Sequence, residues 1–313
     1  MPTITVRKRT TYIVSHNNRE FEVQCEPSGV TEPAIEELPN GKIVIGYLSH
    51  DEDCSNPIED SDGSGRILRG DNRAHRNAIS EALGLDQYGN RDEDLTPNPL
   101  AVLLDKFEHG QSQWYVSTGR DNACDPGGWD TSICAGVWIP DDSCLEHIRS
   151  TAISKLLPEG VKVAYESTSN PDGTAIRRPP REGENPYFTD GTCIDERYHN
   201  VITITYADGT KKGGYKNFVT AYQAAARKLR VKLDKEAIVK GERLLAEECA
   251  RQACECYTDW INGNCYGWAV DVFDKAGERI DHDSCWGIVG DKYANEEMAS
   301  QVAQHVEKHS KAA

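Results

Sequence analysis

The stretch Cys-Tyr-Gly-Trp-Ala-Val-Asp-Val-Phe-Asp-Lys-Ala-Gly-Glu-Arg-Ile at residues 265–280 decides the fold class. Its first nine residues predict a strand, residues 274–277 predict a turn, and residues 278–280 predict a strand that pairs back. A long helix is predicted before this hairpin, starting at an Asp234 cap and ending at Gly263, because apolar residues recur there at intervals of seven and four. An amphipathic helix is predicted after the hairpin, so the C-terminal part reads helix, hairpin, helix.

Two further hairpins are expected upstream. Residues 11–15 and 20–23 flank Asn17 and Asn18, and asparagine tolerates the positive φ of a tight turn. Residues 201–206 alternate between polar and apolar side chains and end just before Asp208-Gly209, a strong hairpin signal. Because the strands come in adjacent hairpins rather than alternating with helices, the sequence predicts an α+β fold, in which antiparallel hairpins pack with a few amphipathic helices.

The chain divides by composition into three regions. Residues 1–41 form an acidic β segment. A core α+β domain is expected at residues 42–157 plus 233–313. Residues 158–232 are expected to form an inserted loop-hairpin-helix unit, because residues 167–197 are rich in loop-forming residues and have no apolar period.

The composition limits the classes of partner. The 313 residues carry 51 acidic and 35 basic side chains, a net charge of −16, and the mean hydropathy is −0.63. A surface of this charge repels nucleic acid and anionic lipid, so direct binding to nucleic acid or a membrane is not expected. No apolar run approaches the ~18 residues of a membrane span, and the N-terminus lacks the apolar region of a secretory signal. We therefore expect a cytoplasmic protein.

The eleven cysteines are odd in number and irregularly spaced. In a cytoplasmic chain this pattern favours free, mostly buried thiols. Cys285 lies beside Trp286 and is expected in the core. The only tight cluster is Cys249, Cys254 and Cys256, and it lacks the spacing of a zinc ribbon.

The motifs of several large enzyme classes are missing. The sequence contains no Gly-x-x-x-x-Gly-Lys-Ser/Thr phosphate loop, no His-Glu-x-x-His and no Gly-x-Ser-x-Gly. These absences favour a protein that is not an enzyme and needs no cofactor.

The acidic residues are unevenly distributed. Residues 22–62 hold eleven acids and a single base, Lys42, which gives this segment a net charge of −10. Proteins that hold DNA present tracks of Lys and Arg to its phosphates, and a folded surface with dense carboxylates can occupy such a track. The segment therefore predicts a DNA-mimicking surface. The candidate partner-binding residues are Glu32, Glu36, Glu37, Asp51, Glu52, Asp53, Glu59, Asp60 and Asp62.

The same loop has a second interpretation. The carboxylates from Asp51 to Asp62 are hard oxygen ligands that suit Ca²⁺ or Mg²⁺. The spacing does not match an EF-hand, because Asn56 stands where the invariant glycine is required. A metal-binding module or small metal-dependent enzyme using this loop is thus an alternative, and a structural or replication accessory protein is a third.

Three stretches of the chain resemble an uncharacterised family of phage and plasmid accessory proteins. The most specific runs from Tyr257 through Tyr266-Gly267-Trp268 to Asp283-Ser284-Cys285-Trp286-Gly287. The others lie at residues 47–65 and at residues 107–110, 129–132 and 135–138. The resemblance implies an origin in a mobile element and assigns no site residue.

Together, these observations predict a non-enzymatic inhibitor of a host defence system, of the anti-restriction or anti-CRISPR type. Its partner would be a nucleic-acid-binding defence protein with a basic groove. The acidic surface would block that groove.

Overall fold

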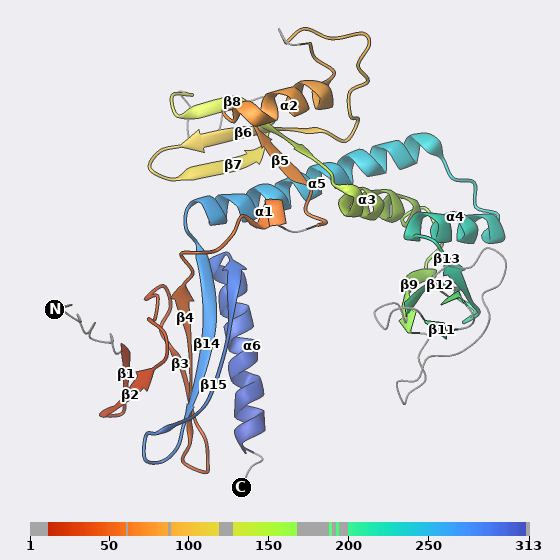
Figure 1. Ribbon diagram of the computed structural model, residues 1–313. Coiled ribbons are helices and arrows are strands. Elements are labelled where there is room, and N and C mark those ends of the chain that lie inside the picture. The colour runs from red at the N-terminus through yellow and green to blue at the C-terminus, as the bar shows by residue number, and fades with distance from the viewer. Residues whose placement is uncertain are drawn as a thin grey trace. The chain divides into compact units, whose positions relative to one another are not determined.

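The computed structural model describes residues 12–60, 62–86, 89–118, 128–167, 188–189, 192–193 and 200–310 (Figure 1). The fold is α+β, as the hairpin pattern predicts. The chain divides into two compact units. The first holds Met1–Asp60, Phe107–Trp114 and Cys254–Ala313, and the second holds Ser61–Lys106 and Tyr115–Ala253.

A four-stranded antiparallel sheet forms the centre of the first unit. Its order is β15-β14-β4-β3, with bounds Arg279–Val289, Cys265–Phe273, Ile43–His50 and Ala34–Glu37. All nine residues of β14 are buried, because β14 lies between two strands and is covered on both faces. The predicted hairpin at residues 265–280 is confirmed, and its second strand continues well past residue 280.

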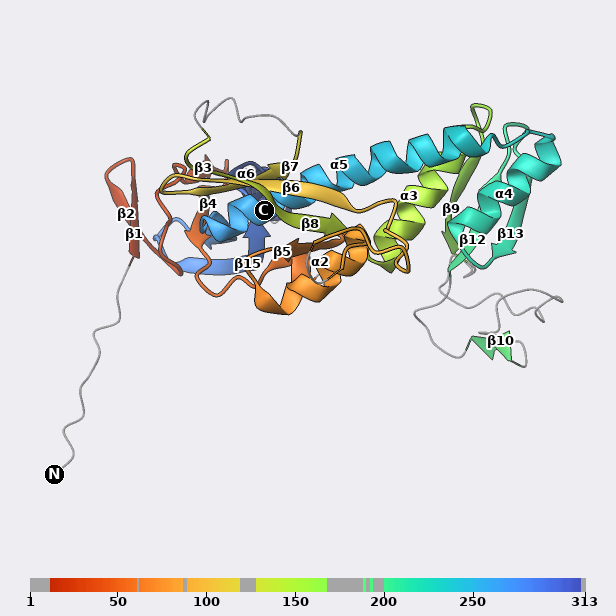
Figure 2. The ribbon, with the colours of Figure 1, turned by 90° about the horizontal axis from the view of Figure 1, so that it is seen from above.

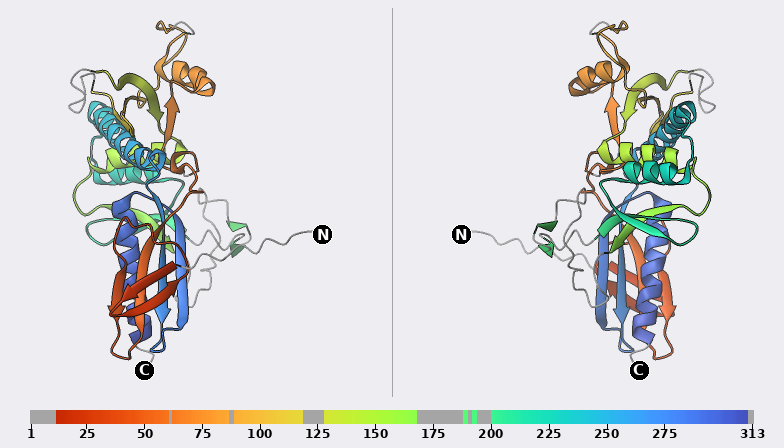
Figure 3. Two further views of the ribbon diagram at one scale, coloured as in Figure 1. Left: turned by 90° about the vertical axis from the view of Figure 1, so that its left-hand side faces the viewer. Right: turned by 90° about the vertical axis from the view of Figure 1, so that its right-hand side faces the viewer.

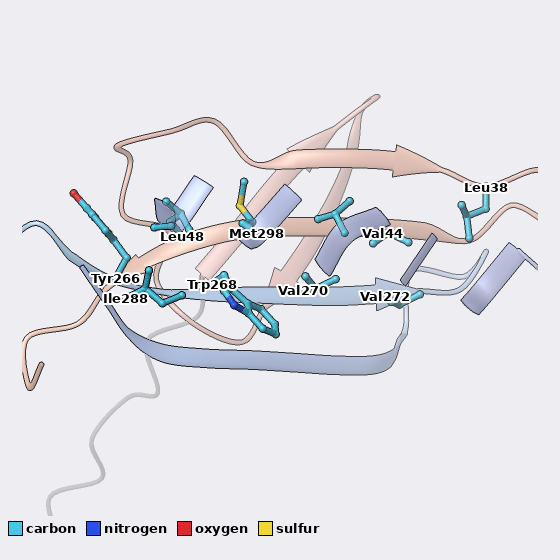
Figure 4. Packing of buried hydrophobic residues seen from close by; sticks show 11 residues of the cluster. Leu38, Val44, Leu48, Tyr266, Trp268, Val270, Val272, Ile288 and Met298 are labelled. Carbon is cyan, nitrogen blue, oxygen red and sulfur yellow. The ribbon is translucent and has the colours of Figure 1, made fainter. Parts of the chain in front are cut away.

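Helix α6 (Asp291–Ser310) covers one face of this sheet (Figure 3). Buried side chains from β4, β14 and α6 make up this core, and Figure 4 shows Val44, Trp268, Val270 and Met298 among them. The helix packs closely where β4 carries a glycine: a Cβ atom on Gly46 would lie 2.2 Å from Val302 Cγ2.

The hairpin of β1 (Tyr12–His16) and β2 (Arg19–Val23) covers the other face. Its turn has φ values of 49° at Asn17 and 60° at Asn18, which are the left-handed conformations that asparagine tolerates. Phe21 is fully buried and its ring centroid lies 5.0 Å from that of Phe273. The predicted N-terminal hairpin is therefore confirmed.

The second unit contains a sheet of order β13-β12-β9, with bounds Lys211–Tyr215, Asn200–Thr205 and Lys162–Ser167. Helix α4 (Phe218–Leu229) lies beside it (Figure 2). Ile204, Ala221 and Ala225 are fully buried in the core that they form. The hairpin predicted at Asp208-Gly209 is present, with φ of 79° at Gly209.

A second four-stranded sheet has the order β5-β8-β6-β7, with bounds Arg66–Arg69, Thr131–Ile139, Val102–Glu108 and Ser112–Val116. Helix α3 (Asp142–Ser154) follows β8, and the Asp141 carboxylate caps it by accepting the Cys144 N–H at 2.8 Å. Helix α2 (Arg76–Leu83) ends at Gly84, whose φ is 67°. The remaining short elements are α1 (Pro57–Asp60), η1 (Arg73–His75), β10 (Phe188–Thr189) and β11 (Thr192–Cys193).

Helix α5 (Lys235–Ile261) is the longest helix, as expected. The Asp234 carboxylate accepts the Glu236 N–H at its start, and Gly263 follows its end with φ of 80°. Among the residues that the structure describes, neither α5 nor any other helix combines the length and the apolar character that crossing a membrane requires.

The two units differ from the division predicted by composition. Residues 12–41 are not a separate segment, since β3 pairs with β4 and the β1–β2 hairpin packs on the same sheet. The predicted core at 42–157 plus 233–313 contributes to both units, and the predicted insertion at 158–232 lies within the second. Residues 168–187, the heart of that insertion, lie outside the described part of the chain.

Candidate acidic interaction surface

A row of glutamates follows the outer side of β4. The Ser28 N–H donates to the Leu48 carbonyl at 2.6 Å, and farther along β3 pairs with β4 from Ala34 opposite Gly46 to Glu37 opposite Ile43. The segment from residue 26 to residue 37 therefore runs antiparallel along this edge of the sheet. Its exposed acids are Glu26, Glu32, Glu36 and Glu37. We call these four residues, together with Asp51, Glu52 and Asp53 of the pocket described next, the acidic edge.

A cavity of about 760 Å³ lies where this segment passes the end of β4. Four acidic residues, Glu26, Asp51, Glu52 and Asp53, line it together with Trp286. Trp286 is 45 % exposed. Its ring lies against Gly267, because a Cβ atom there would be 2.4 Å from the indole. The other lining residues are Cys25, Pro27, Ser28, Ser49 and His50.

Asp51 differs from its acidic neighbours because the fold uses its carboxylate. Oδ2 accepts the Gly287 N–H at 2.9 Å, and Oδ1 accepts the Asp53 N–H at 3.2 Å. Its own N–H donates to the Cys265 carbonyl at 2.9 Å. Asp51 thus connects β4 to both β14 and the end of β15, and it is half-buried.

Most of the other predicted partner-binding acids are free surface groups. Within the described ranges, no Lys, Arg or His forms an ion pair with the exposed residues Glu32, Glu36, Glu52, Asp53, Glu59 or Asp62. Eight of the nine predicted residues belong to the first unit and Asp62 belongs to the second. The side chain of Asp60 lies outside the described residues.

The β1–β2 hairpin holds two glutamates of the row: the Tyr12 hydroxyl donates a hydrogen bond to Glu26, and side chains at the hairpin tip contact Glu37. The Glu37 Oε1 atom accepts a hydrogen bond from Asn17 at 2.7 Å and lies 3.0 Å from His16 Nε2. The hydrogen bond from Asn17, followed by that from His16, lowers the pKa of Glu37. Its carboxylate therefore keeps its charge while fixing the tip of the β1–β2 hairpin.

The metal alternative draws little support from the described part of the loop. No group of three His, Cys, Asp or Glu side chains there is arranged to hold a metal ion. Both carboxylate oxygens of Asp51 already accept hydrogen bonds from backbone N–H groups, and Asp62 belongs to the other unit.

A buried network that the sequence did not reveal lies on the face of the same sheet that the β1–β2 hairpin covers. Asp271 is fully buried on β14. Its Oδ2 accepts hydrogen bonds from the Tyr47 hydroxyl at 3.0 Å and the Gln24 N–H at 3.1 Å, while Oδ1 lies 2.8 Å from His282 Nδ1 and 3.6 Å from an Arg279 nitrogen. Burial raises the pKa of Tyr47. A carboxylate inside an apolar strand was the only signal in the sequence.

The thiols are free, but fewer are buried than expected. Of the nine cysteines whose side chains are described, none forms a disulfide, and only Cys144, Cys254 and Cys265 are buried. Cys285 is exposed beside the half-exposed Trp286, so its predicted place in the core is wrong. The reason is that β15 is an edge strand whose side chains are mostly exposed. Cys124 lies outside the described residues, and no burial is described for Cys193.

Comparison with known proteins gives no relative for this site. No protein-family model, no curated protein and no solved structure matches the chain.

Proposed function

We propose that this chain is a non-enzymatic inhibitor from a mobile element that binds a host defence protein through the acidic edge. The observation that carries the proposal is the row of exposed carboxylates at Glu26, Glu32, Glu36 and Glu37, which ends at the acids of the pocket. The partner is a nucleic-acid-binding protein with a groove of Lys and Arg side chains, such as a restriction or CRISPR effector. The acidic edge occupies that groove in place of DNA.

The length of the acidic edge is suited to part of a DNA turn. Glu36 pairs with Val44 of β4, and Asp51, just past the end of that strand, lies seven residues farther along the chain. At ~3.3 Å per residue in a strand, the acids span ~23 Å, which is about two thirds of the ~34 Å turn of B-DNA. Duplex DNA carries a charge every ~1.7 Å of its axis, so the acidic edge is less densely charged than the ligand it replaces.

Two consequences follow from this charge arrangement. The chain itself avoids nucleic acid, because its net charge of −16 repels phosphates, and it acts in the cytoplasm, where its partner works. Its binding to the partner weakens as salt is added, because exposed charges are screened beyond a Debye length of ~8 Å at 0.15 M ionic strength.

Charge reversal tests the proposal. Four acids of the acidic edge with exposed side chains and no described partner can be changed together to lysine: Glu32, Glu36, Glu52 and Asp53. Asp51 is left out because the fold uses its carboxylate. The measurement is phage plating on hosts that carry a restriction or CRISPR system, with and without the expressed protein.

The matched control reverses four exposed acids elsewhere: Glu81, Glu93, Glu159 and Glu255. Both variants change the net charge equally, so only the position of the charges differs. We expect the acidic-edge variant to lose protection of the phage and the control to keep it. Equal loss in both would mean that net charge alone acts, and full activity of the acidic-edge variant would contradict the proposal.

A further inference from the structure

Helices α3 and α5 of the second unit pack against each other through small residues. Gly241 on α5 lies against Ala152 on α3, where an added Cβ atom would be 3.5 Å from the Ala152 Cβ. A glycine facing an alanine lets two helix axes approach closely. This contact fixes the register of the pair.

The same register brings two cysteines together. Cys144 precedes Ala152 by eight residues on α3, and Cys249 follows Gly241 by eight residues on α5. Eight residues span ~12 Å along an α-helix, so both cysteines lie the same distance along their helices from the Gly241–Ala152 contact. The Cys144 thiol accordingly donates a hydrogen bond to the Cys249 sulfur.

The two thiols differ in access. Cys144 is 1 % exposed, whereas Cys249 is only partly buried. A small oxidant can therefore reach Cys249 first, with Cys144 directly behind it.

We propose that Cys144 and Cys249 form a reversible oxidation site that converts to a disulfide joining α3 to α5. The oxidant is a low-molecular-weight disulfide such as oxidised glutathione. The proposal concerns the second unit and is independent of the acidic edge.

The reaction proceeds in two exchanges. The Cys249 thiolate attacks one sulfur of oxidised glutathione, which forms a mixed disulfide and releases one glutathione thiolate. Cys144 then loses its proton, and its thiolate attacks the Cys249 sulfur, which releases the second glutathione. Two protein thiols and one glutathione disulfide thus become one protein disulfide and two glutathione thiols.

The electrostatics agree with this order of events. The hydrogen bond from Cys144 lowers the pKa of Cys249, so Cys249 has the larger thiolate fraction. That hydrogen bond and burial raise the pKa of Cys144, which keeps it protonated until Cys249 has reacted.

Other cysteines provide internal comparisons. Cys134 is exposed, and no other thiol is described as its partner, so oxidised glutathione should leave it as a mixed disulfide. Cys265 hydrogen-bonds with Cys54 in the first unit, but burial first, and then this hydrogen bond, raise the pKa of Cys265 to about 12. This pair belongs to the first unit, so the mass spectra report on it separately from Cys144 and Cys249 of the second.

The test uses the full chain, reduced and then incubated with mixtures of oxidised and reduced glutathione, followed by alkylation, digestion and mass spectrometry. We expect a peptide pair linked through Cys144 and Cys249. Its mass should be two hydrogen atoms below the summed masses of the two thiol peptides, and dithiothreitol should separate it again. Cys249→Ser should abolish the linked pair, Cys144→Ala should leave Cys249 as the glutathione mixed disulfide, and Cys134→Ser should change neither.

The proposal can be contradicted by results on the unmodified chain alone, so the test does not depend on whether the variants fold. Persistent glutathione on Cys249 in that chain, or Cys249 remaining fully alkylated in the most oxidising mixture, would show that the pair does not close. A thermal melt of the oxidised chain gives a second readout. A rise in the unfolding temperature that is lost in Cys249→Ser is expected, and an unchanged temperature despite complete linkage would contradict a bond that joins the two helices in their native packing.

Discussion

The Asp51 Oδ2 atom accepts the Gly287 N–H at 2.9 Å, although the two residues are 236 positions apart in the chain. This hydrogen bond connects the end of β4 with the end of β15, beside the indole of Trp286. It gives one acid of the pocket a structural role that its neighbours Glu52 and Asp53 do not share.

Alanine substitution should therefore separate Asp51 from Asp53. We expect Asp51→Ala to lower the free energy of unfolding by about 1–3 kcal/mol, because two backbone donors lose their acceptor. Asp53→Ala should change it by less than about 0.5 kcal/mol, as for most exposed positions. Urea denaturation measures both. A chelator added to the unmodified chain should leave its stability unchanged. If chelation reproduced the effect of Asp51→Ala, the metal interpretation of this loop would be correct.

A larger loss is expected at Asp271. Its carboxylate is fully buried and holds the Tyr47 hydroxyl, the Gln24 N–H, His282 and Arg279 together. Removing one partner from a buried charged network costs about 3–5 kcal/mol, because the remaining polar groups stay buried without a partner. We expect Asp271→Ala to reduce the free energy of unfolding by that amount in urea. The control is Asp283→Ala, an exposed acid on β15, which should fall within about 0.5 kcal/mol of the unmodified chain. If both substitutions lowered the free energy of unfolding equally, the proposed structural role of the Asp271 network would be wrong.

How far the sequence could predict this fold depends on how local each signal is. The β1–β2 hairpin and the α3 cap were predictable, because Asn17, Asn18 and Asp141 act on their immediate neighbours. Strand β3 was not, since its four residues become a strand only by pairing with β4. Strand β15 was expected to end near residue 280 but continues to Val289, because its pairing with β14 outweighs its polar composition.

The candidate site was predictable to a similar degree. Charge counting identified the acids, since composition is visible in the sequence. It could not separate Asp62, which belongs to the other unit, or recognise that Asp51 binds a backbone N–H near the far end of the chain. The contact between Cys144 and Cys249 depends on how α3 and α5 pack, and residue spacing on one helix does not reveal its partner.

The pH dependence of stability should show the contribution of Asp281. Hydrogen bonds from Lys308 and then from His309 on α6, at 2.7 and 2.8 Å, lower its pKa to about 2. The unfolded value is ~3.9, so the folded state favours the charged form. This stabilisation is fully present above the unfolded pKa and is lost as the pH falls through about 2.

A double-mutant cycle isolates that term. Asp281→Asn, Lys308→Met and the pair together give a coupling free energy, which we expect to be about 1 kcal/mol near pH 6 because solvent screens the partly exposed Lys308. The coupling should decline from pH 4 to pH 2 in urea denaturation. A coupling that stayed constant over this range would show that charge on Asp281 does not connect β15 to α6.

Two glycines that face neighbouring side chains should respond in opposite directions to alanine. At Gly46 the new methyl group would lie 2.2 Å from Val302 Cγ2, so α6 must shift away from β4, and overpacking of this kind costs about 1–3 kcal/mol. At Gly241 the methyl group would meet Ala152 Cβ at 3.5 Å, an ordinary contact, and alanine in a helix interior is favoured over glycine by up to about 1 kcal/mol. Thermal and urea unfolding of Gly46→Ala and Gly241→Ala should therefore show a loss and a gain. Because both substitutions add the same single methyl group, a loss at both positions would mean that α3 and α5 pack more tightly than this contact indicates, and a gain at both would mean that α6 does not sit on Gly46.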